Sequence, residues 1–297
     1  MNELLSNLKL TQMEIMNFVN RSQAVKQTGL SYLGGVNISA KIEKNKKVNM
    51  KTFVIYLAPA NLSGYNVCSH STPECRMGCL NTSGRAGMEE LAGKTKTADC
   101  RAKKTRLLIE QPNFFMNWLI AEIKAQKVLA EKDGFYFSIR LNGTSDVDWA
   151  NIKLNGKNIF EIFPTIQFYD YTKNHNKFKT YVKNYHLTMS YTGRNWQVCE
   201  MLLQQNKNVA VVFDVKKGKP LPETFNGYKV VDGDITDYRP NDGKGVIVGL
   251  RWKVIANKEV NDYVRNSCFV VRPQKINGFI TYNTKQVAVE QTEKVKV

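Results

Sequence analysis

The first apolar run of the chain, Thr52-Phe-Val-Ile-Tyr-Leu-Ala58, has the length and composition of a buried strand. Further runs of the same kind follow it, each separated from the next by a turn or an amphipathic stretch. They are Phe135–Leu141, Thr165–Tyr169, His186–Ser190, Val209–Phe213, Tyr228–Val231, Val246–Leu250 and Cys268–Val271. Because the runs are apolar almost without interruption and helical patterns lie between them, they predict a mostly parallel sheet covered by helices.

This α/β pattern predicts a complete or partial β/α barrel of the TIM type, with a doubly wound open sheet as the alternative. A long helical region is expected over residues 88–131, broken where Pro112 enters the first turn of a second helix. Shorter helices are expected over residues 158–163, 174–183 and 195–205. We divide the chain into an N-terminal extension (1–50), a barrel-like cluster-binding domain (51–273) and a C-terminal tail (274–297).

Three cysteines lie within twelve residues directly after the first strand, at Cys68, Cys75 and Cys79. Such crowding of thiolates is typical of a soft metal or a cluster. Three thiolates can hold three irons of a [4Fe-4S] cluster and leave the fourth iron open, or hold a [3Fe-4S] form. The alternatives are a zinc site closed by Cys100 or His70, or a loop without metal. Gaps of six and three residues differ from the paired short gaps of structural zinc sites, so we favour the iron-sulfur cluster.

The remaining cysteines are assigned by their place in the predicted elements. Cys100 lies in the next helix and is either a fourth cluster ligand or a small buried residue. Cys199 and Cys268 fall within a predicted helix and strand and are expected in the core.

Polar and charged residues follow most of the predicted strands, where ligands bind in parallel sheets. Arg140 and Asn142 are the first choices for holding an anionic or polar ligand, because a guanidinium fork binds carboxylate or phosphate at two points. The candidates for an acid, a base or a hydrogen-bond acceptor are Asp146, Asp170 and Asp232. The alternative for these residues is that they cap helices and stabilise turns. Of Tyr169 and Tyr171, only one is expected to face the site.

Composition limits the class of protein. A chain of 297 residues with 42% hydrophobic content can bury a full core, and no signal peptide or membrane-spanning run is visible. We therefore expect a cytoplasmic protein, whose six cysteines stay reduced. The net charge of +17 would attract nucleic acid or an acidic partner, although no standard nucleic-acid-binding motif is present.

The chain resembles the gene-88 product family of bacteriophage proteins over roughly residues 34–273. The resemblance is carried by Cys68, Cys75 and Cys79 with Leu80-Asn-Thr-Ser-Gly84, by Arg140-Leu-Asn-Gly-Thr-Ser-Asp146, by Phe168-Tyr-Asp-Tyr-Thr-Lys173, by Asp232-Gly-Asp234 and by Val246-Ile-Val-Gly-Leu250. It implies a phage origin, a cysteine-rich loop and an iron-sulfur cluster. In the family the position of Cys100 is more often a small residue, which implies three protein ligands.

The loop after the first strand of a β/α barrel is also where radical S-adenosylmethionine enzymes carry their cluster cysteines. This chain is similar in that respect but differs in cysteine spacing, and no glycine-glycine-glutamate segment follows its second strand. S-adenosylmethionine is therefore not favoured as a cofactor. The leading prediction is an iron-sulfur oxidoreductase or metal-assisted enzyme that acts on a small molecule at the open iron. The alternatives are a nucleic-acid or host-protein binding module with a structural metal, and a radical S-adenosylmethionine-type enzyme.

Overall fold

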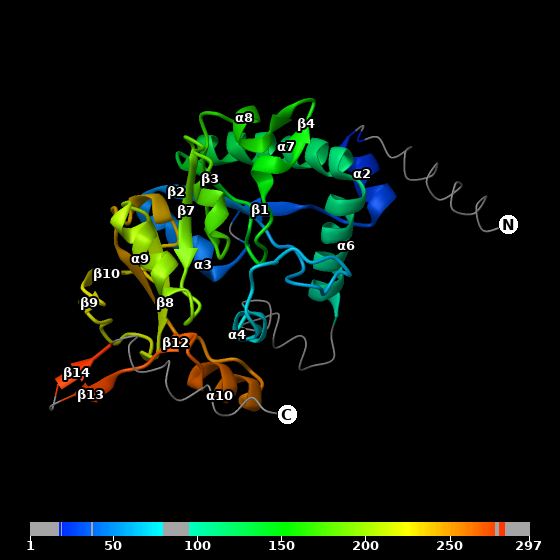
Figure 1. The fold of residues 1–297 in the computed structure, drawn as a ribbon. Helices are drawn as coiled ribbons and strands as arrows, with labels where there is room; N and C mark the ends of the chain where they lie inside the picture. The colour runs from blue at the N-terminus through cyan, green and yellow to red at the C-terminus, as the bar shows by residue number, and fades with distance from the viewer. Residues whose placement is uncertain (1–17, 19, 37, 80–94, 277–278, 283–297) are drawn as a thin grey trace.

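The computed structural model describes residue 18 and residues 20–36, 38–79, 95–276 and 279–282. A mixed sheet of ten strands lies at the centre of this part of the chain (Figure 1). Its strands are β1 (Gly34–Val36), β2 (Met50–Ile55), β3 (Tyr136–Arg140), β6 (Gln167–Thr172), β7 (Tyr185–Ser190), β8 (Asn208–Phe213), β9 (Thr224–Phe225), β10 (Tyr228–Asp232), β11 (Ile247–Arg251) and β12 (Val270–Val271). Each predicted strand is present, with its ends shifted by up to a few residues.

Most strands of the sheet are parallel. The order is β1-β2-β3-β6-β7-β8-β11-β10-β9, with β12 beside β8, and only β1 and β9 run antiparallel to their neighbours. From β2 to β8 the strands lie in chain order, so successive connections cross in one direction along the sheet. Within the described residues no pairing joins β1 to β9, and the complete or partial barrel therefore stays a prediction.

The helices predicted from the sequence form, with one exception, and further helices form that were not predicted. Pro112 stands in the first turn of α7 (Pro112–Lys132), directly after α6 (Lys96–Glu110), as predicted. The start of that helical region, residues 88–94, lies outside the described residues. The helix predicted over residues 174–183 is wrong beyond its first turn, because only the 3-10 helix η3 (His175–Phe178) forms before the chain turns back into β7. The other helices are α2 (Arg21–Thr28), α3 (Ala40–Glu43), α4 (Pro73–Met77), α8 (Ile159–Ile162), α9 (Trp196–Gln204) and α10 (Lys258–Asn266), with 3-10 turns η1 (Lys44–Val48), η2 (Trp149–Asn151) and η4 (Arg239–Asn241).

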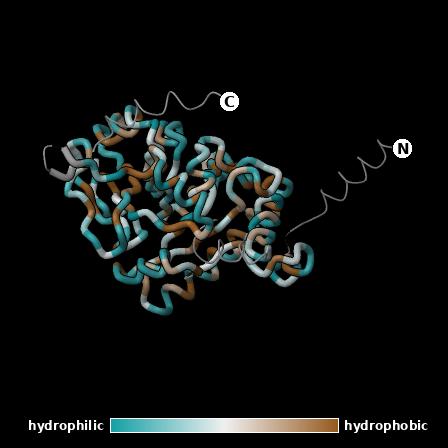
Figure 2. The backbone as a smooth tube through the Cα atoms, turned by 90° about the horizontal axis from the view of Figure 1, so that it is seen from below, coloured by the Kyte–Doolittle hydropathy of each residue, from teal (hydrophilic) through white to brown (hydrophobic). Residues whose placement is uncertain are grey.

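One face of the sheet is apolar and is covered by helices. Phe115, Trp118 and Leu119 of α7 lie fully buried in one core cluster with strand residues such as Phe53 and Ile139. Helices α6, α7 and α8 gather on this side of the sheet in Figure 1. Figure 2 shows many apolar segments in the interior and many polar turns at the outside. Burial of this large apolar surface supplies the main driving force for folding.

Alternate residues of a strand point to opposite sides of the sheet, and on the opposite face β2, β3 and β6 carry buried polar side chains. The hydroxyl groups of Thr52 in β2 and Ser138 in β3 form a hydrogen bond of 2.8 Å. Asn45 of η1 donates to Thr52 at 2.8 Å and to the Tyr169 hydroxyl at 3.0 Å. Its Oδ1 accepts the backbone N–H of Asp237 at 2.7 Å. This polar layer leads to the carboxyl ends of the parallel strands.

Two small antiparallel sheets complete the described structure. They consist of β4 (Lys153–Leu154) with β5 (Lys157–Asn158), and β13 (Gln274–Ile276) with β14 (Phe279–Thr281). The second pair lies in the segment expected as a tail, and β1 lies in the segment expected as an extension. None of the helices described here is long and apolar enough to cross a membrane.

Candidate functional site

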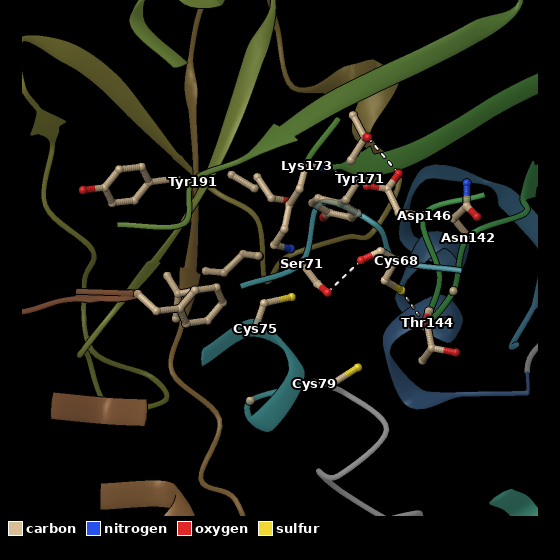
Figure 3. Close-up of a pocket in the computed structure, with 18 of the residues that line it drawn as sticks. Cys68, Ser71, Cys75, Cys79, Asn142, Thr144, Asp146, Tyr171, Lys173 and Tyr191 are labelled. Carbon is tan, nitrogen blue, oxygen red and sulfur yellow. Dashed lines mark hydrogen bonds between the residues drawn. The ribbon is translucent and has the colours of Figure 1, made fainter. Parts of the chain in front are cut away.

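A pocket of about 230 Å³ lies at the carboxyl ends of β3, β6, β7, β8 and β11. Cys68, Cys75 and Cys79 all line it (Figure 3). So do residues from the ends of the strands, among them Arg140, Asn142, Asp146, Tyr171, Lys173, Ser190, Val212 and Leu250. The pocket thus brings the cysteine loop together with side chains from strands far apart in the sequence.

The cysteine loop contains a short helix whose start is encoded locally. Thr72 accepts the backbone N–H of Cys75 at 3.2 Å, and Pro73 occupies the first helical position of α4. Cys75 therefore sits in the middle of α4, and Cys79 follows the residue that ends it. In Figure 3 the sulfur atoms of these two cysteines and of Cys68 face the same space. The shared motif segment Leu80–Gly84 lies outside the described residues.

Two hydrogen bonds to neighbouring side chains fix the backbone of Cys68. Its N–H donates to Asn66 Oδ1 at 3.0 Å, and its carbonyl oxygen accepts the Ser71 hydroxyl at 2.7 Å. Its Sγ lies 3.9 Å from the carbonyl oxygen of Thr144, in the loop after β3. Burial raises the pKa of the Cys68 thiol, and the neighbouring Cys75 sulfur contributes to the increase.

The loop after β3 packs tightly against the end of β2. Gly143 donates its backbone N–H to Ile55 O at 3.0 Å, and a Cβ at this glycine would lie only 2.5 Å from the same oxygen. A glycine is therefore required where this loop passes beneath the cysteine loop.

Lys173 at the end of β6 extends its ammonium group among the thiols. In Figure 3 this group points toward the Cys75 sulfur, which attracts it electrostatically. Burial lowers the pKa of Lys173, but the sulfur atoms of Cys75 and Cys79 and the carboxylate of Asp146 more than offset this and raise it overall. Lys173 was not predicted as a site residue, although it lies in the polar segment that follows the predicted strand Thr165–Tyr169.

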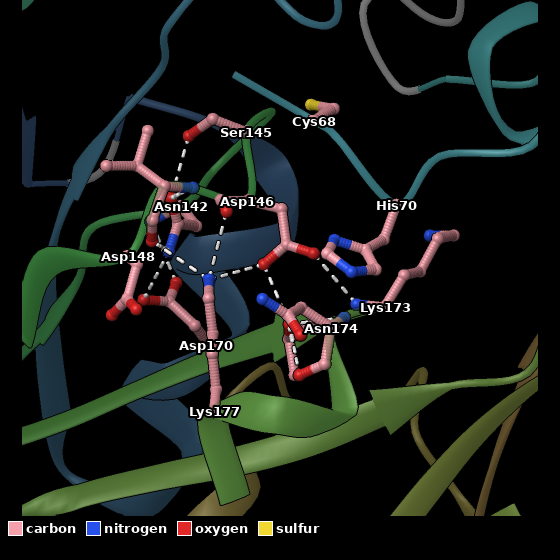
Figure 4. Close-up of polar contacts among 12 residues, drawn as sticks. Cys68, His70, Asn142, Ser145, Asp146, Asp148, Asp170, Lys173, Asn174 and Lys177 are labelled. Atoms are coloured by element: carbon pink, nitrogen blue, oxygen red, sulfur yellow. Dashed lines mark hydrogen bonds and ion pairs between the residues drawn. The ribbon is translucent and has the colours of Figure 1, made fainter. Parts of the chain in front are cut away.

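Asp146 lines the pocket, but its carboxylate is used to join two loops (Figure 4). Oδ1 accepts Lys177 Nζ at 2.6 Å and Thr172 Oγ1 at 2.8 Å, while Oδ2 accepts the backbone N–H of Lys173 at 2.8 Å. These bonds orient the segment that carries Lys173. Asp146 is therefore placed as a positioning residue for the pocket wall.

Asn142 also lines the pocket, yet both ends of its amide are engaged within the protein. Oδ1 accepts from Ser145 Oγ at 2.8 Å, Val147 N at 2.9 Å and Trp149 Nε1 at 3.2 Å. Nδ2 donates to Val147 O at 3.1 Å and to Asp170 Oδ2 at 3.3 Å. The amide organises the loop after β3, which argues against its predicted role in holding a ligand.

Asp170 lies behind this loop and does not line the pocket. Its carboxylate accepts the backbone N–H of Asn142 at 2.8 Å and the Tyr185 hydroxyl at 3.0 Å. Complete burial raises its pKa to about 7. We expected Asp170 to follow its strand, but β6 continues to Thr172, so Asp170 points to the face opposite the pocket.

Only one of the two tyrosines reaches the pocket, as expected, although their side chains point to the same side of the sheet. Tyr169 and Tyr171 are two residues apart within β6 and therefore share one face of the sheet. Tyr171 lines the pocket, and the Tyr169 hydroxyl donates to Asp237 Oδ2 at 3.1 Å in the polar layer beneath.

Arg140 lines the pocket and is anchored from behind. Its Nη1 donates to Asp237 Oδ2 at 2.8 Å, and Lys41 pairs with Asp237 Oδ1 at 2.8 Å. Both cations also lie over the ring of Tyr171, with Arg140 Cζ at 4.9 Å and Lys41 Nζ at 4.7 Å from its centroid. Burial raises the pKa of Asp237, but Arg140 and Lys41 outweigh burial and hold it well below its usual range.

Asp232 does not line the pocket, but it supports residues that do. It binds Arg251 through two contacts of 2.8 Å, and Asp234 Oδ2 lies 3.2 Å from Arg251 Nη1. The sequence analysis missed Arg251, Lys41 and Asp237. The run of acidic residues from position 232 to 237 was a signal that such cations lie nearby.

The remaining candidate ligands lie elsewhere. Cys100 packs half-buried against the apolar core and does not line the pocket, while Cys199 and Cys268 are buried. His70 is exposed, and its Nδ1 lies 3.0 Å from Ser69 Oγ. Among the residues described here, no three His, Cys, Asp or Glu side chains are grouped closely enough to hold a single metal ion.

Comparison with known proteins gives one match. No curated protein and no solved structure matches the chain significantly. A family model described as Gene product 88 matches residues 22–266, which is well over half of the sequence. This confirms the family resemblance carried by the cysteine loop and the segments after the strands. The chain belongs to the Gene product 88 family.

Proposed function

We propose that this protein is a phage-encoded iron-sulfur enzyme in which Cys68, Cys75 and Cys79 hold a [4Fe-4S] or [3Fe-4S] cluster. The observation that carries the proposal is that all three cysteines line one pocket and present their sulfur atoms to the same space (Figure 3). Thiolate is the usual protein ligand of such clusters.

The surroundings of the cysteines also suit an iron-sulfur cluster. Three thiolates bring more negative charge than a cubane core neutralises, and Lys173 places a buried positive charge against Cys75. A hydrogen bond from an ammonium group to a cysteine sulfur stabilises the thiolate form and tunes the reduction potential. Asp146 fixes the backbone of Lys173 and so holds this group in place.

When bound, such a cluster supplies electron transfer or Lewis-acid activation at the iron that no cysteine holds. The protein itself excludes bulk water, binds the small molecule against the strand ends and orients it with the basic side chains of the pocket. We infer an oxidoreductase or a metal-assisted enzyme on this basis.

The test is anaerobic purification followed by iron and sulfide analysis and paramagnetic resonance. The wild type is expected to contain iron and acid-labile sulfide and to give a cluster signal after reduction or oxidation. Cys75→Ser is expected to lose both the metal and the signal, because Cys75 stands at the centre of the proposed ligand set.

Cys100→Ser is the matched control, since Cys100 is also half-buried but lies outside the pocket. It is expected to retain the cluster. Loss of the cluster in this variant would make Cys100 a fourth ligand. Wild-type protein without iron and sulfide after reconstitution would refute the proposal.

A further inference from the structure

Basic side chains gather in the part of the pocket that is lined by β3, α3 and the segment after β11. Lys41, Arg140 and Lys253 line the cavity there. Lys41 and Arg140 lie over the ring of Tyr171, and repulsion from Lys41 acts on Lys253. These three cations are spread over more than two hundred residues of the sequence, so only the folded chain brings them together.

The carboxylates nearby do not balance these cations. Asp237 is shared between Lys41 and Arg140, so that one negative charge serves two positive charges. Asp232 and Asp234 both bind Arg251, and Asp234 also lines the cavity and attracts Lys253, so that four cations here face three carboxylates. Lys253 forms no ion pair with a carboxylate in the part of the chain that the structure describes. The inner pocket therefore carries an excess of positive charge.

The properties of Lys253 agree with this excess. Desolvation, followed by repulsion from Lys41, lowers the pKa of Lys253 to about 8. Its side chain is nevertheless exposed and lines the cavity, so an incoming ligand can reach it. An anion bound here would relieve the repulsion between the two lysines.

The rest of the wall restricts what the anion can belong to. Val212, Leu250, Trp252 and Phe269 line the same cavity and give it an apolar side. The volume of about 230 Å³ lies below the range of about 300–1,000 Å³ that is usual for drug-sized ligands. The pocket therefore fits a small metabolite better than a polymer strand.

We propose that Lys41, Arg140 and Lys253 form an oxyanion subsite that binds the carboxylate or phosphate group of a small, partly apolar molecule. The apolar wall would take the body of this molecule, and the cysteine loop lies in the same cavity. The subsite depends on the fold alone. That its ligand is a substrate rests on the proposed iron-sulfur function.

Calorimetric titration with inorganic phosphate and with acetate, at constant ionic strength, tests the subsite. The wild type is expected to bind at least one of these anions saturably. Lys253→Gln removes one charge and is expected to weaken binding about threefold, and Lys253→Glu reverses it and is expected to weaken binding about tenfold or more. Lys229→Gln, which changes an exposed lysine of β10 outside the pocket, is the matched control and is expected to bind like the wild type.

The preferred anion identifies the ligand class, because tighter phosphate binding indicates a phosphoryl compound and tighter acetate binding a carboxylate. Absence of saturable binding of both anions, or equal binding by wild type and Lys253→Glu, would overturn the proposal. The same titrations on protein stripped of metal separate the two hypotheses. Anion binding in a protein that never holds iron would leave the subsite standing and remove the iron-sulfur function.

Discussion

The cysteine loop and the loop after β3 lie next to each other in one pocket, but they use their polar groups differently. In the loop after β3, both ends of the Asn142 side-chain amide are hydrogen-bonded within the protein. In the cysteine loop, Cys68 Sγ has a long contact of 3.9 Å with Thr144 O, and the Cys75 sulfur faces the ammonium group of Lys173. The comparison teaches that a polar group at a strand end is a candidate for chemistry only when the fold leaves it able to bind something else.

The largest loss of stability is expected when the fully buried carboxylate of Asp237 is removed. Asp237→Asn leaves Arg140 and Lys41 without their shared counterion, so the free energy of unfolding should fall by about 3–5 kcal/mol in urea titrations. Asp262→Asn removes a carboxylate from an exposed pair with Lys258 and should lower the free energy of unfolding far less. Similar losses in the two variants would show that the polar layer is not a supporting structure.

The next effect concerns the loop after β3 directly. Asn142→Ala leaves several buried donors and acceptors without partners, and it should lower the free energy of unfolding by about 2–4 kcal/mol. Asn151→Ala is the matched control, because Asn151 is exposed and bonds to Asp148. It should change stability by less than about 0.5 kcal/mol. A small loss for Asn142→Ala would return this residue to the list of ligand-binding candidates.

The pH dependence of stability tests Asp170, which supports the loop after β3. Its pKa is about 7 in the folded protein, against about 3.9 for an unfolded aspartate. Between these values the folded state holds a proton that the unfolded chain has lost, so this group makes stability fall as the pH rises. We expect the wild type to lose about 2 kcal/mol more than Asp170→Asn between pH 5 and pH 8, as measured by chemical denaturation. Parallel stability curves for the two proteins would contradict the assignment.

The smallest effect on stability is expected in the cysteine loop. In metal-free protein, Cys75→Ser should change the free energy of unfolding by less than about 1 kcal/mol, because it replaces one half-buried atom that faces a cavity. The same substitution is expected to abolish iron binding. A loss of several kcal/mol in the metal-free variant would mean that Cys75 serves the fold and not a ligand.

Several features of the fold could be predicted because they depend on local patterns. The apolar runs identified every strand of the parallel sheet, and Pro112 marked the boundary between α6 and α7. Strand ends were less predictable. Polar residues such as Asp170 and Tyr171 belong to β6, because backbone pairing with β7 continues past the last apolar residue. That shift decided which of the candidate side chains reach the pocket.

By itself, the sequence determined that a mostly parallel sheet forms and that a cysteine loop follows its first strand, because strand periodicity, helix capping and cysteine spacing are local properties. Only the tertiary structure decided which polar groups were already satisfied and which charges shared a cavity. Lys41, Lys173 and Lys253 are ordinary basic residues in the chain. They acquire a role because strand order brings them to one pocket, where their charges act on the same cavity.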